Sequence, residues 1–584
     1  MRRIALMLAF VLACPALEFA QTTFGSITGT VTDSTGAVVA GAQVQATEKQ
    51  SGYSYQTQTT GDGVYTIANL REGSYTVTAA APGFEETKVA DIQLVSREVR
   101  RLDLQMQVGA VSSTVEVKAT TASPIETETA RISQTRSSME LEDLPLNTRG
   151  VSSFLALAPG IGQATTVTAT YRFNGSRRNQ SEFTVDGISN ITNNGTQTSP
   201  LTNYLESFQE VRIDSADNTA DAGAIGQVTV VSKSGTNELH GSLFDYYQTP
   251  VFRARDFFAQ TRATGISHQP GGSIGGPIVI PKIYNGHDKT FFYYDFETSR
   301  GSQTQNLLRA QVPLAAWRTG DFSGLLPGIT IKDPTNNTAF AGNRIPMNRW
   351  NPVSIAIQNL FYPLPNAGFA QTNLTSNQNY VQQLTHPFDP NTFWSGRLDH
   401  RISDKTFLYS RFTWQRQMTT DYEDNLPTIG RVTDTRNTRN AVGSWSQIFS
   451  PTLVNEIRYG MMYTNEPRWG AQNGSSLVRQ LGLTGLLPNL PNLPGIPNLS
   501  FSGLGLTGLT QTAYGSPDFQ NFNQFIQEQL TWTRGKHTVR AGMQLGRFYA
   551  DNTVESNNLF GNLSFSNKYT GFAYADFLLG YPNS

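Results

Sequence analysis

Cysteine is almost absent from this chain. The only one among 584 residues is Cys14, which lies in an apolar stretch at the N-terminus. Disulfides are therefore not expected to hold the rest of the chain together. Charge is scarce as well, because Asp, Glu, Lys and Arg make up 15 % of the residues and the formal net charge is −1. Without a basic surface, nucleic acid is not expected as a partner.

The sequence also lacks the motifs of the common enzyme classes. Its six histidines are scattered, and none belongs to an H-E-x-x-H motif or has a cysteine nearby that could complete a zinc site. "GLGLTG" at 503–508 matches the glycine pattern of dinucleotide-binding loops, but no strand precedes it and no helix follows it. No phosphate-binding G-x-x-x-x-G-K-[ST] and no nucleophile motif G-x-S-x-G is present. We expect no catalytic residue, no metal site and no cofactor, and hence a protein that is not an enzyme.

Long hydrophobic runs are missing beyond the first residues. "MRRIALMLAFVLACPALEFAQ" places two arginines before an apolar run from Ile4 to Ala13, which predicts a secretory signal peptide over 1–20. The run is too short for a spanning helix, which needs about 20 apolar residues. An alternative for "VLAC" is a lipoprotein cleavage box that would anchor the chain at Cys14.

Glycine and aromatic residues are abundant: there are 51 Gly, 33 Phe and 22 Tyr. From Phe24, short alternating runs such as "ITGTV", "VYTIANL" and "SYTVTA" are separated by turn sequences, which predicts a small β-sandwich over 24–105. The spacing resembles that of the carboxypeptidase regulatory-like domain, a prealbumin-like module whose superfamily is grouped with carbohydrate-binding folds. This resemblance implies a fold and no peptidase chemistry. A spacer and a sugar-binding module are both open alternatives.

Seven sequence blocks follow one another in a recognisable order after a polar connector. The blocks are "DLPLNTRG", "LALAPGIG", "NGSRRNQSEFTVDGI", "IGQVTVVSKSGTNELHGSLF", "QPGGSIGGPI", "KTFFYYDFE" and "RTGDFSGL". In this order they resemble the TonB-dependent outer-membrane receptors of the Oar-like type, in which a regulatory-like module precedes a plug domain and a large β-barrel.

Helices are predicted at 138–144 and 151–157, each before a proline.

The resemblance implies roles for two segments. The connector at 106–124 contains "STVEVKA", so Val115, Glu116 and Val117 stand where such receptors have a TonB box, which an inner-membrane energiser grasps by strand pairing. Residues 125–235 would form the plug. We expect its polar surface to face the lumen side chains of the barrel, with the candidates Arg172, Arg177, Arg178 and Asn179. The alternative is that these four side chains only satisfy turn backbone and solvent.

In residues 236–584, apolar and polar residues alternate as they do in transmembrane β-strands. In "LVNEIRYGMMYT", Ile457 and Tyr459 point one way while Glu456 and Arg458 point the other, as expected for a lipid face and a lumen face. The long insert at 302–390 and the Pro- and Leu-rich stretch at 482–511 are predicted to be extracellular loops. Eight to ten strands can be recognised, whereas the receptors close with twenty-two. We therefore expect the N-terminal part of a barrel, from a truncated or partial reading frame, or one that assembles with other strands.

The predicted fold class is mainly β: an N-terminal prealbumin-like β-sandwich, a small α/β plug domain and a partial antiparallel transmembrane β-barrel. The predicted function is that of an outer-membrane TonB-dependent receptor that binds a solute for energised uptake. Expected partners are outer-membrane lipid, a TonB-type energiser and an extracellular solute that the sequence does not identify, with a carbohydrate and a peptide as candidates. The alternatives are an outer-membrane surface or adhesion scaffold that transports nothing, and an exported carbohydrate-binding β-protein.

Overall fold

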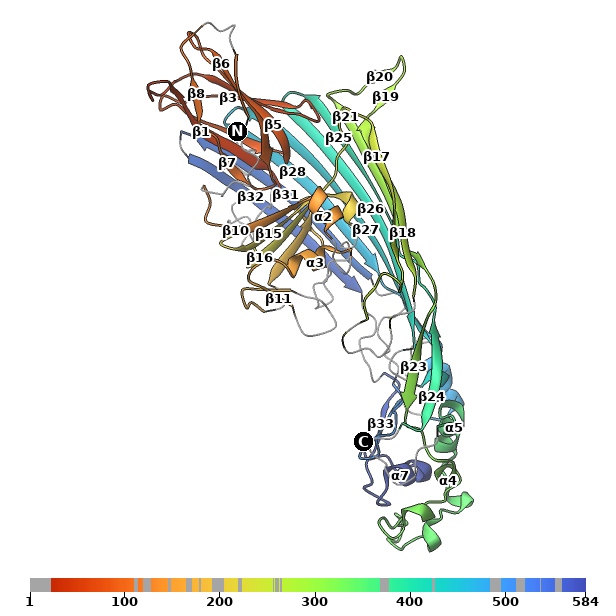
Figure 1. Cartoon of the computed structure of the whole chain (residues 1–584). Helices are drawn as coiled ribbons and strands as arrows, with labels where there is room; N and C mark the ends of the chain where they lie inside the picture. Colours follow the sequence, from red (N-terminus) through yellow and green to blue (C-terminus); the bar gives the residue numbers. More distant parts are fainter. Residues whose placement is uncertain are drawn as a thin grey trace, which may run out of the picture.

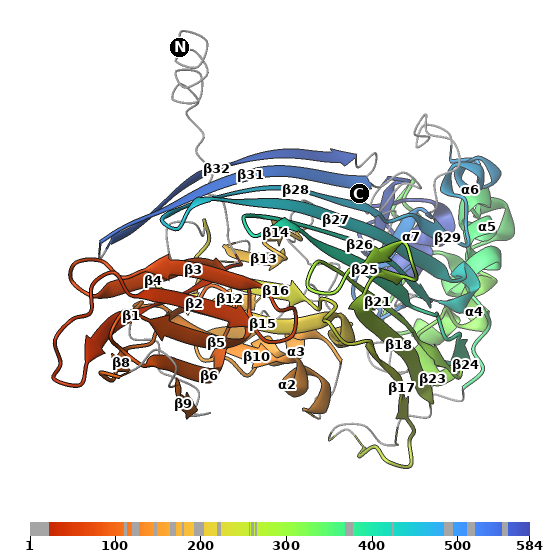
Figure 2. The same cartoon turned by 90° about the horizontal axis from the view of Figure 1, so that it is seen from above.

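The computed structural model shows a mainly β protein in which one large curved sheet holds two smaller β units on its concave side (Figures 1 and 2). The structure describes residues 23–109, 114–118, 128–144, 149–163, 171–177, 180–191, 204–218, 223–255, 257, 262, 265–367, 378–422, 426–483, 495–510, 520–535, 537–551 and 559–584. The predicted signal peptide lies outside these residues. The predicted fold class is confirmed.

The first unit is the expected β-sandwich. One sheet contains β1 (Gly25–Asp33), β4 (Val64–Leu70), β7 (Val99–Arg101) and β8 (Leu104–Met106). The other has the order β3 (Ser54–Gln58), β2 (Gln43–Glu48), β5 (Gly73–Ala80), β6 (Glu86–Leu94) and β9 (Thr114–Lys118). Alternate residues of these strands, such as Ile27, Val44 and Val77, are completely buried between the sheets, which is the period-2 pattern that the sequence shows.

The second unit lies where the sequence predicts the plug domain, and we call it the plug. Its sheet has the order β10 (Ile132–Ser137), β15 (Phe208–Ala216), β16 (Gly226–Ser232), β13 (Ser181–Val185) and β14 (Ile188–Ser189), and β11 (Ile161–Gln163) pairs with β12 (Tyr171–Phe173). Helices α2 (Ser138–Asp143) and α3 (Val151–Leu155) confirm the two predicted helices. Ser137 and Glu140 form a capping box that starts α2. Phe154 from α3 packs into the plug core.

The large sheet consists of long antiparallel strands. Its successive members are β17 (His240–Gln248), β18 (Ser267–Pro277), β21 (Thr290–Thr298), β25 (Thr392–Ser403), β26 (Thr406–Asp421), β27 (Val432–Ser450), β28 (Leu453–Asn465), β31 (Gln520–Arg534) and β32 (His537–Asp551). Along β28, Ile457 and Tyr459 are exposed on the convex face, whereas Glu456 and Arg458 are buried on the concave face. The predicted separation of apolar and polar faces is confirmed.

The inserts between the strands fold together at one end of the sheet. We call this body the cap. It contains β23 (Thr304–Ala310), α4 (Ala315–Arg318), α5 (Pro352–Phe361), β24 (Tyr380–His386), α6 (Gly474–Gln480), β30 (Asn498–Phe501), β33 (Asn562–Phe565) and α7 (Ala573–Leu579). Every residue of α7 is buried. The cap has its own apolar core, which includes Trp317, Phe361, Phe501 and Phe577, so the inserts predicted as extracellular loops form a folded body.

The sandwich and the plug are joined by the turn between β6 and β7. In this turn the Ser96 N–H donates to Glu210 Oε1 over 2.7 Å, and Arg97 Nη1 donates to Gln227 Oε1 over 2.7 Å. The Arg97 side chain is 1 % exposed. Figure 1 shows the sandwich at the end of the large sheet that lies opposite the cap. Among the described residues, no helix has the length and hydropathy needed to span a membrane.

Candidate functional site at the interface between plug and sheet

A tight hairpin of the plug presents one carboxylate to the large sheet. Asp186 and Gly187 join β13 to β14 with φ angles of 51° and 76°, the left-handed values that a two-residue Asp-Gly turn requires. The Asp186 side chain is 2 % exposed. It accepts the N–H of Ser232 over 2.9 Å and also the hydroxyl of Ser232.

Two arginines of the sheet converge on this hairpin. Arg411 on β26 donates through Nε to Asp186 Oδ2, and its other nitrogens donate to Thr413 and Asn440. Arg397 on β25 donates to the carbonyl of Ser232 over 2.7 Å, and its nearest nitrogen lies 3.9 Å from Asp186 Oδ1. Burial alone would raise the pKa of Asp186, but these two guanidinium groups hold it below its ordinary value.

Further ion pairs connect Arg397 of the sheet with the sandwich. Arg397 forms a two-pronged ion pair with Asp399, with N–O distances of 2.9 and 3.0 Å. Asp399 in turn accepts from Arg71 of the sandwich over 2.6 Å and from Ser234 over 2.8 Å. Plug, sheet and sandwich therefore meet through buried charges that are paired with one another.

Polar groups also line the other half of the interface. Glu206 of the plug accepts from Ser242 on β17 and from Ser273 on β18, over 2.7 and 3.2 Å. Arg149 lies 3.7 Å from Glu297 on β21, and its guanidinium carbon lies 3.3 Å from the centre of the Tyr246 ring. These contacts are ones that water can replace when the two surfaces separate.

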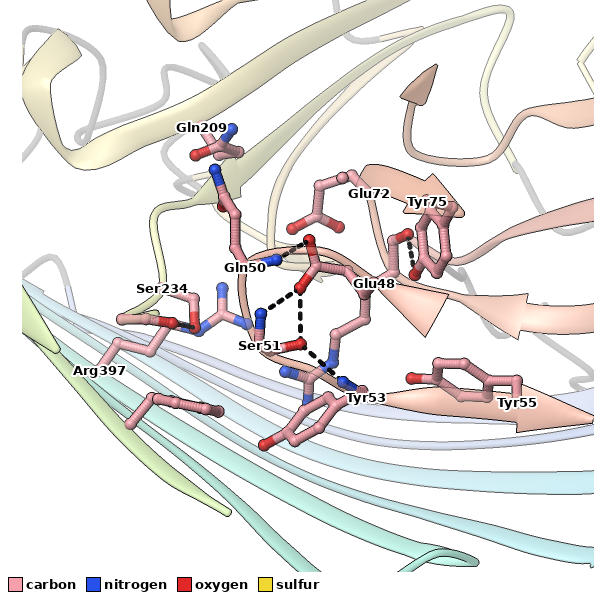
Figure 3. Close-up of a pocket in the computed structure, with 14 residues that line it drawn as sticks. Glu48, Gln50, Ser51, Tyr53, Tyr55, Glu72, Tyr75, Gln209, Ser234 and Arg397 are labelled. Carbon is pink, nitrogen blue, oxygen red and sulfur yellow. Dashed lines mark hydrogen bonds between the residues drawn. The ribbon is translucent and has the colours of Figure 1, made fainter. Parts of the chain in front are cut away.

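The three units enclose a small cavity of about 60 Å³. Figure 3 shows Tyr53 and Glu72 from the sandwich together with Ser234 and Arg397 along its wall. Glu48 is held in place by its own turn, because its carboxylate accepts the N–H groups of Gln50 and Ser51. Burial, together with the nearby carboxylate of Glu210, raises the pKa of Glu72 to about 8.

Of the residues that the sequence singled out, those that the structure describes lie elsewhere. Arg172 on β12 and Arg177 in the following turn are exposed, and their predicted contact with lumen side chains stays a prediction. Arg178 and Asn179 lie outside the described residues. Val115, Glu116 and Val117 form the middle of β9.

Asp186 and its two arginines are not among the residues predicted from the sequence. The Asp-Gly pair in "TVDGI" was a usable signal for the hairpin, since Asp-Gly favours such turns. For Arg397 and Arg411 the signal was their place on the polar face of alternating strands. In the parts of the chain that the structure describes, no group of three or more His, Cys, Asp or Glu side chains could hold a metal ion.

Comparison with known proteins fits this architecture. A family model described as outer membrane beta barrel domain matches residues 231–584, and one for the carboxypeptidase regulatory-like domain matches residues 26–107. The TonB-dependent transporter Oar of Myxococcus xanthus is 26 % identical over 369 residues, which are 58 % of this chain. The chain spans 31 % of the length of that relative.

The chain is also similar to two solved structures. The ferric-catecholate import receptor Fiu from E. coli is 11 % identical, with a TM-score of 0.33 over 73 % of this chain and 60 % of that one. The siderophore receptor PirA from Pseudomonas aeruginosa is 10 % identical, with a TM-score of 0.31 over 72 % of this chain and 57 % of that one. The family match covers more than half of the chain. The chain therefore belongs to the outer membrane beta barrel domain family, and the resemblance to Oar-like TonB-dependent receptors that the sequence indicates is confirmed by the similarity to Oar.

Proposed function

We propose that this protein takes up a solute across the outer membrane by an energised movement of the plug. The observation that carries the proposal is the nature of the contact between plug and sheet, which includes the buried charged and polar pairs around Asp186 and Glu206. A buried polar interface can open into water at less cost than an apolar core, because water replaces the hydrogen bonds that separation breaks.

The two ends of the sheet would have different tasks. The end with the sandwich and β9 would face the periplasm, where an energiser could grasp the Val115–Val117 segment by strand pairing. The cap at the opposite end would face the outside. Because four separate segments of the chain meet in its core, the cap offers a folded surface on which a carbohydrate or a peptide could bind before it reaches the plug.

The test replaces Val115 and Val117 by proline, which removes two backbone donors and prevents strand pairing there. Uptake of a panel of labelled oligosaccharides and peptides is then measured in cells. We expect the energised component of uptake to disappear while the amount of protein in the outer membrane stays the same. The matched control carries proline at Thr120 and Thr121 in the same connector and should keep uptake. Uptake that is equal in the Val115/Val117 variant and the natural chain would contradict the proposal.

A further inference from the structure

One hairpin at the sandwich end of the large sheet exposes apolar side chains. Residues 278–289 join β18 to β21 and contain β19 (Val279–Ile280) and β20 (Tyr284–Asn285), which pair with each other. Val279 and Ile280 are each nearly half exposed, and Ile283 in the turn between them and β20 is 81 % exposed. Exposed apolar side chains that cluster in this way are typical of a surface that meets a partner or a membrane.

Contacts at the base of the hairpin hold it in place. The N–H of Ile278 donates to the carbonyl of Thr290 over 2.9 Å, and the hydroxyl groups of Tyr284 and Thr290 are hydrogen-bonded to each other. The carboxylate of Asp288 accepts from Asn237 Nδ2 over 2.6 Å. The apolar side chains are therefore presented by a structured element.

The tip of the hairpin has a lysine where the backbone favours glycine. The N–H of Ile283 donates to the carbonyl of Ile280 over 3.0 Å, which closes a β-turn with Pro281 and Lys282 at its centre. Lys282 has a φ of 66°, a left-handed value for which glycine or asparagine is favoured at the third position of a turn. Lys289, at the other end of the hairpin, is also exposed. The hairpin thus combines apolar side chains with two exposed positive charges.

The hairpin extends the apolar convex face of the large sheet. Ile274 on β18 and Tyr294 and Phe296 on β21 are exposed on that face, which meets lipid in an outer-membrane protein. Figure 1 shows β19 and β20 beyond the ends of these strands, on the side away from the sandwich. Apolar side chains with neighbouring lysines fit the border of a bilayer, because the former leave water while the ammonium groups meet anionic phosphates.

We propose that residues 278–289 anchor the chain in the periplasmic leaflet of the outer membrane. Val279, Ile280 and Ile283 enter the acyl region of the leaflet, and the two lysines lie at the phosphates of its phospholipids. The choice of leaflet rests on the proposed function, in which the sandwich end of the sheet faces the periplasm. The anchor holds the sandwich ends of β18 and β21 at the membrane surface.

The experiment places a fluorophore on Ile283→Cys in the full chain, reconstituted into vesicles of phosphatidylethanolamine and phosphatidylglycerol. Quenching by iodide reports contact with water, and quenching by spin labels on the acyl chains reports contact with lipid. The matched control is Asp404→Cys, in the turn between β25 and β26, where 89 % of the Asp404 side chain is exposed. This turn lies at the same end of the sheet, since the N–H of Arg401 donates to the carbonyl of Lys289 over 2.7 Å. Cys14→Ser removes the natural cysteine as a second labelling site.

We expect quenching by the lipid spin labels to be severalfold stronger at residue 283 than at residue 404, and quenching by iodide to be severalfold weaker. Lys282→Glu combined with Lys289→Glu should reduce the lipid quenching at residue 283, because the reversed charges are repelled by anionic phosphates. Lys405→Glu, in the turn of the control, should leave it unchanged. Equal iodide quenching at residues 283 and 404 would overturn the proposal.

A polymer-linked maleimide, which does not cross the outer membrane, separates the remaining outcomes. If Ile283→Cys resists the maleimide in isolated outer membranes but is open to iodide in the vesicles, a protein partner covers the hairpin and the proposal is wrong. If Asp404→Cys reacts in intact cells, the sandwich end faces outward, and the periplasmic assignment fails together with the proposed function even where lipid quenching persists. Loss of lipid quenching without reaction in intact cells would overturn the anchor alone.

Discussion

At the scale of single residues, Asp186 connects the plug with the sheet. Its carboxylate is surrounded by two guanidinium groups and the Ser232 backbone, and nearly all of this cluster is shielded from solvent. A buried ion pair adds little net stability compared with an apolar contact, but removal of one partner leaves the other charge buried without compensation. The plug hairpin should therefore depend strongly on this one carboxylate.

Replacement of Asp186 by alanine should loosen the plug. We expect the free energy of plug undocking to fall by about 3–5 kcal/mol, the cost of one buried charge left without its partner. A urea titration that follows protease resistance of the plug measures this quantity. Asp404→Ala is the control, because Asp404 pairs with Arg401 at the surface with 89 % of its side chain exposed. A loss of similar size in both variants would contradict the role of Asp186.

Glu72 should make the junction of the three units sensitive to pH. The pKa of its carboxyl is about 8 in the folded protein and 4.5 when unperturbed, so the folded state favours the protonated form. The resulting stabilisation is fully present below about pH 4.5 and is lost as the pH rises towards 8. Protease resistance of the junction between sandwich and plug should therefore decrease between about pH 5 and pH 8. Glu72→Gln should flatten this dependence, and an unchanged slope in that variant would contradict the assignment.

At the scale of elements, the sequence was most informative where a local pattern repeats. The strands of the sandwich, the helices α2 and α3 and the two faces of β28 were all predictable, because each depends on residues within one segment. The cap was not predictable in this way. The aromatic residues of its core, such as Trp317, Phe501 and Phe577, come from segments that lie far apart in the chain, and no local period links them. The same reason explains why Asp186 and Arg411 could not be paired in advance.

The contact between β14 and β28 depends on a glycine. A Cβ atom at Gly460 would lie 2.5 Å from two side-chain carbons of Ile188, which is completely buried. Gly460→Ala should therefore weaken plug docking by about 1–3 kcal/mol, the usual cost of overpacking. The urea titration described for Asp186 provides the measurement.

Two further variants test whether this effect is local. Ile188→Ala combined with Gly460→Ala should recover part of the lost docking, because the smaller side chain makes room for the new methyl group. Gly443→Ala on β27 should have little effect, since a Cβ atom at Gly443 would meet no other atom within 4 Å. If plug docking in the double variant is weaker than in both single variants, Ile188 does not pack against Gly460.

At the scale of the whole molecule, sandwich, plug and sheet form one connected assembly. The turn at Ser96 and Arg97 holds the sandwich to the plug, and the chain from Asp186 through Arg397 to Asp399 and Arg71 holds both to the sheet. The cap lies at the far end of the same sheet (Figure 1). This order along the sheet is the basis of the proposed path of a solute from cap to plug.

The central claim is that the plug occupies the concave face of the sheet in the outer membrane, with β14 seated on β28. The most direct measurement is disulfide formation between Ile188→Cys and Gly460→Cys in isolated outer membranes, followed by the mobility of the chain in a non-reducing gel. We predict rapid and nearly complete crosslinking in the membrane fraction. A chain that fractionates with the membrane but does not crosslink, or one recovered only from the soluble periplasm, would contradict the account.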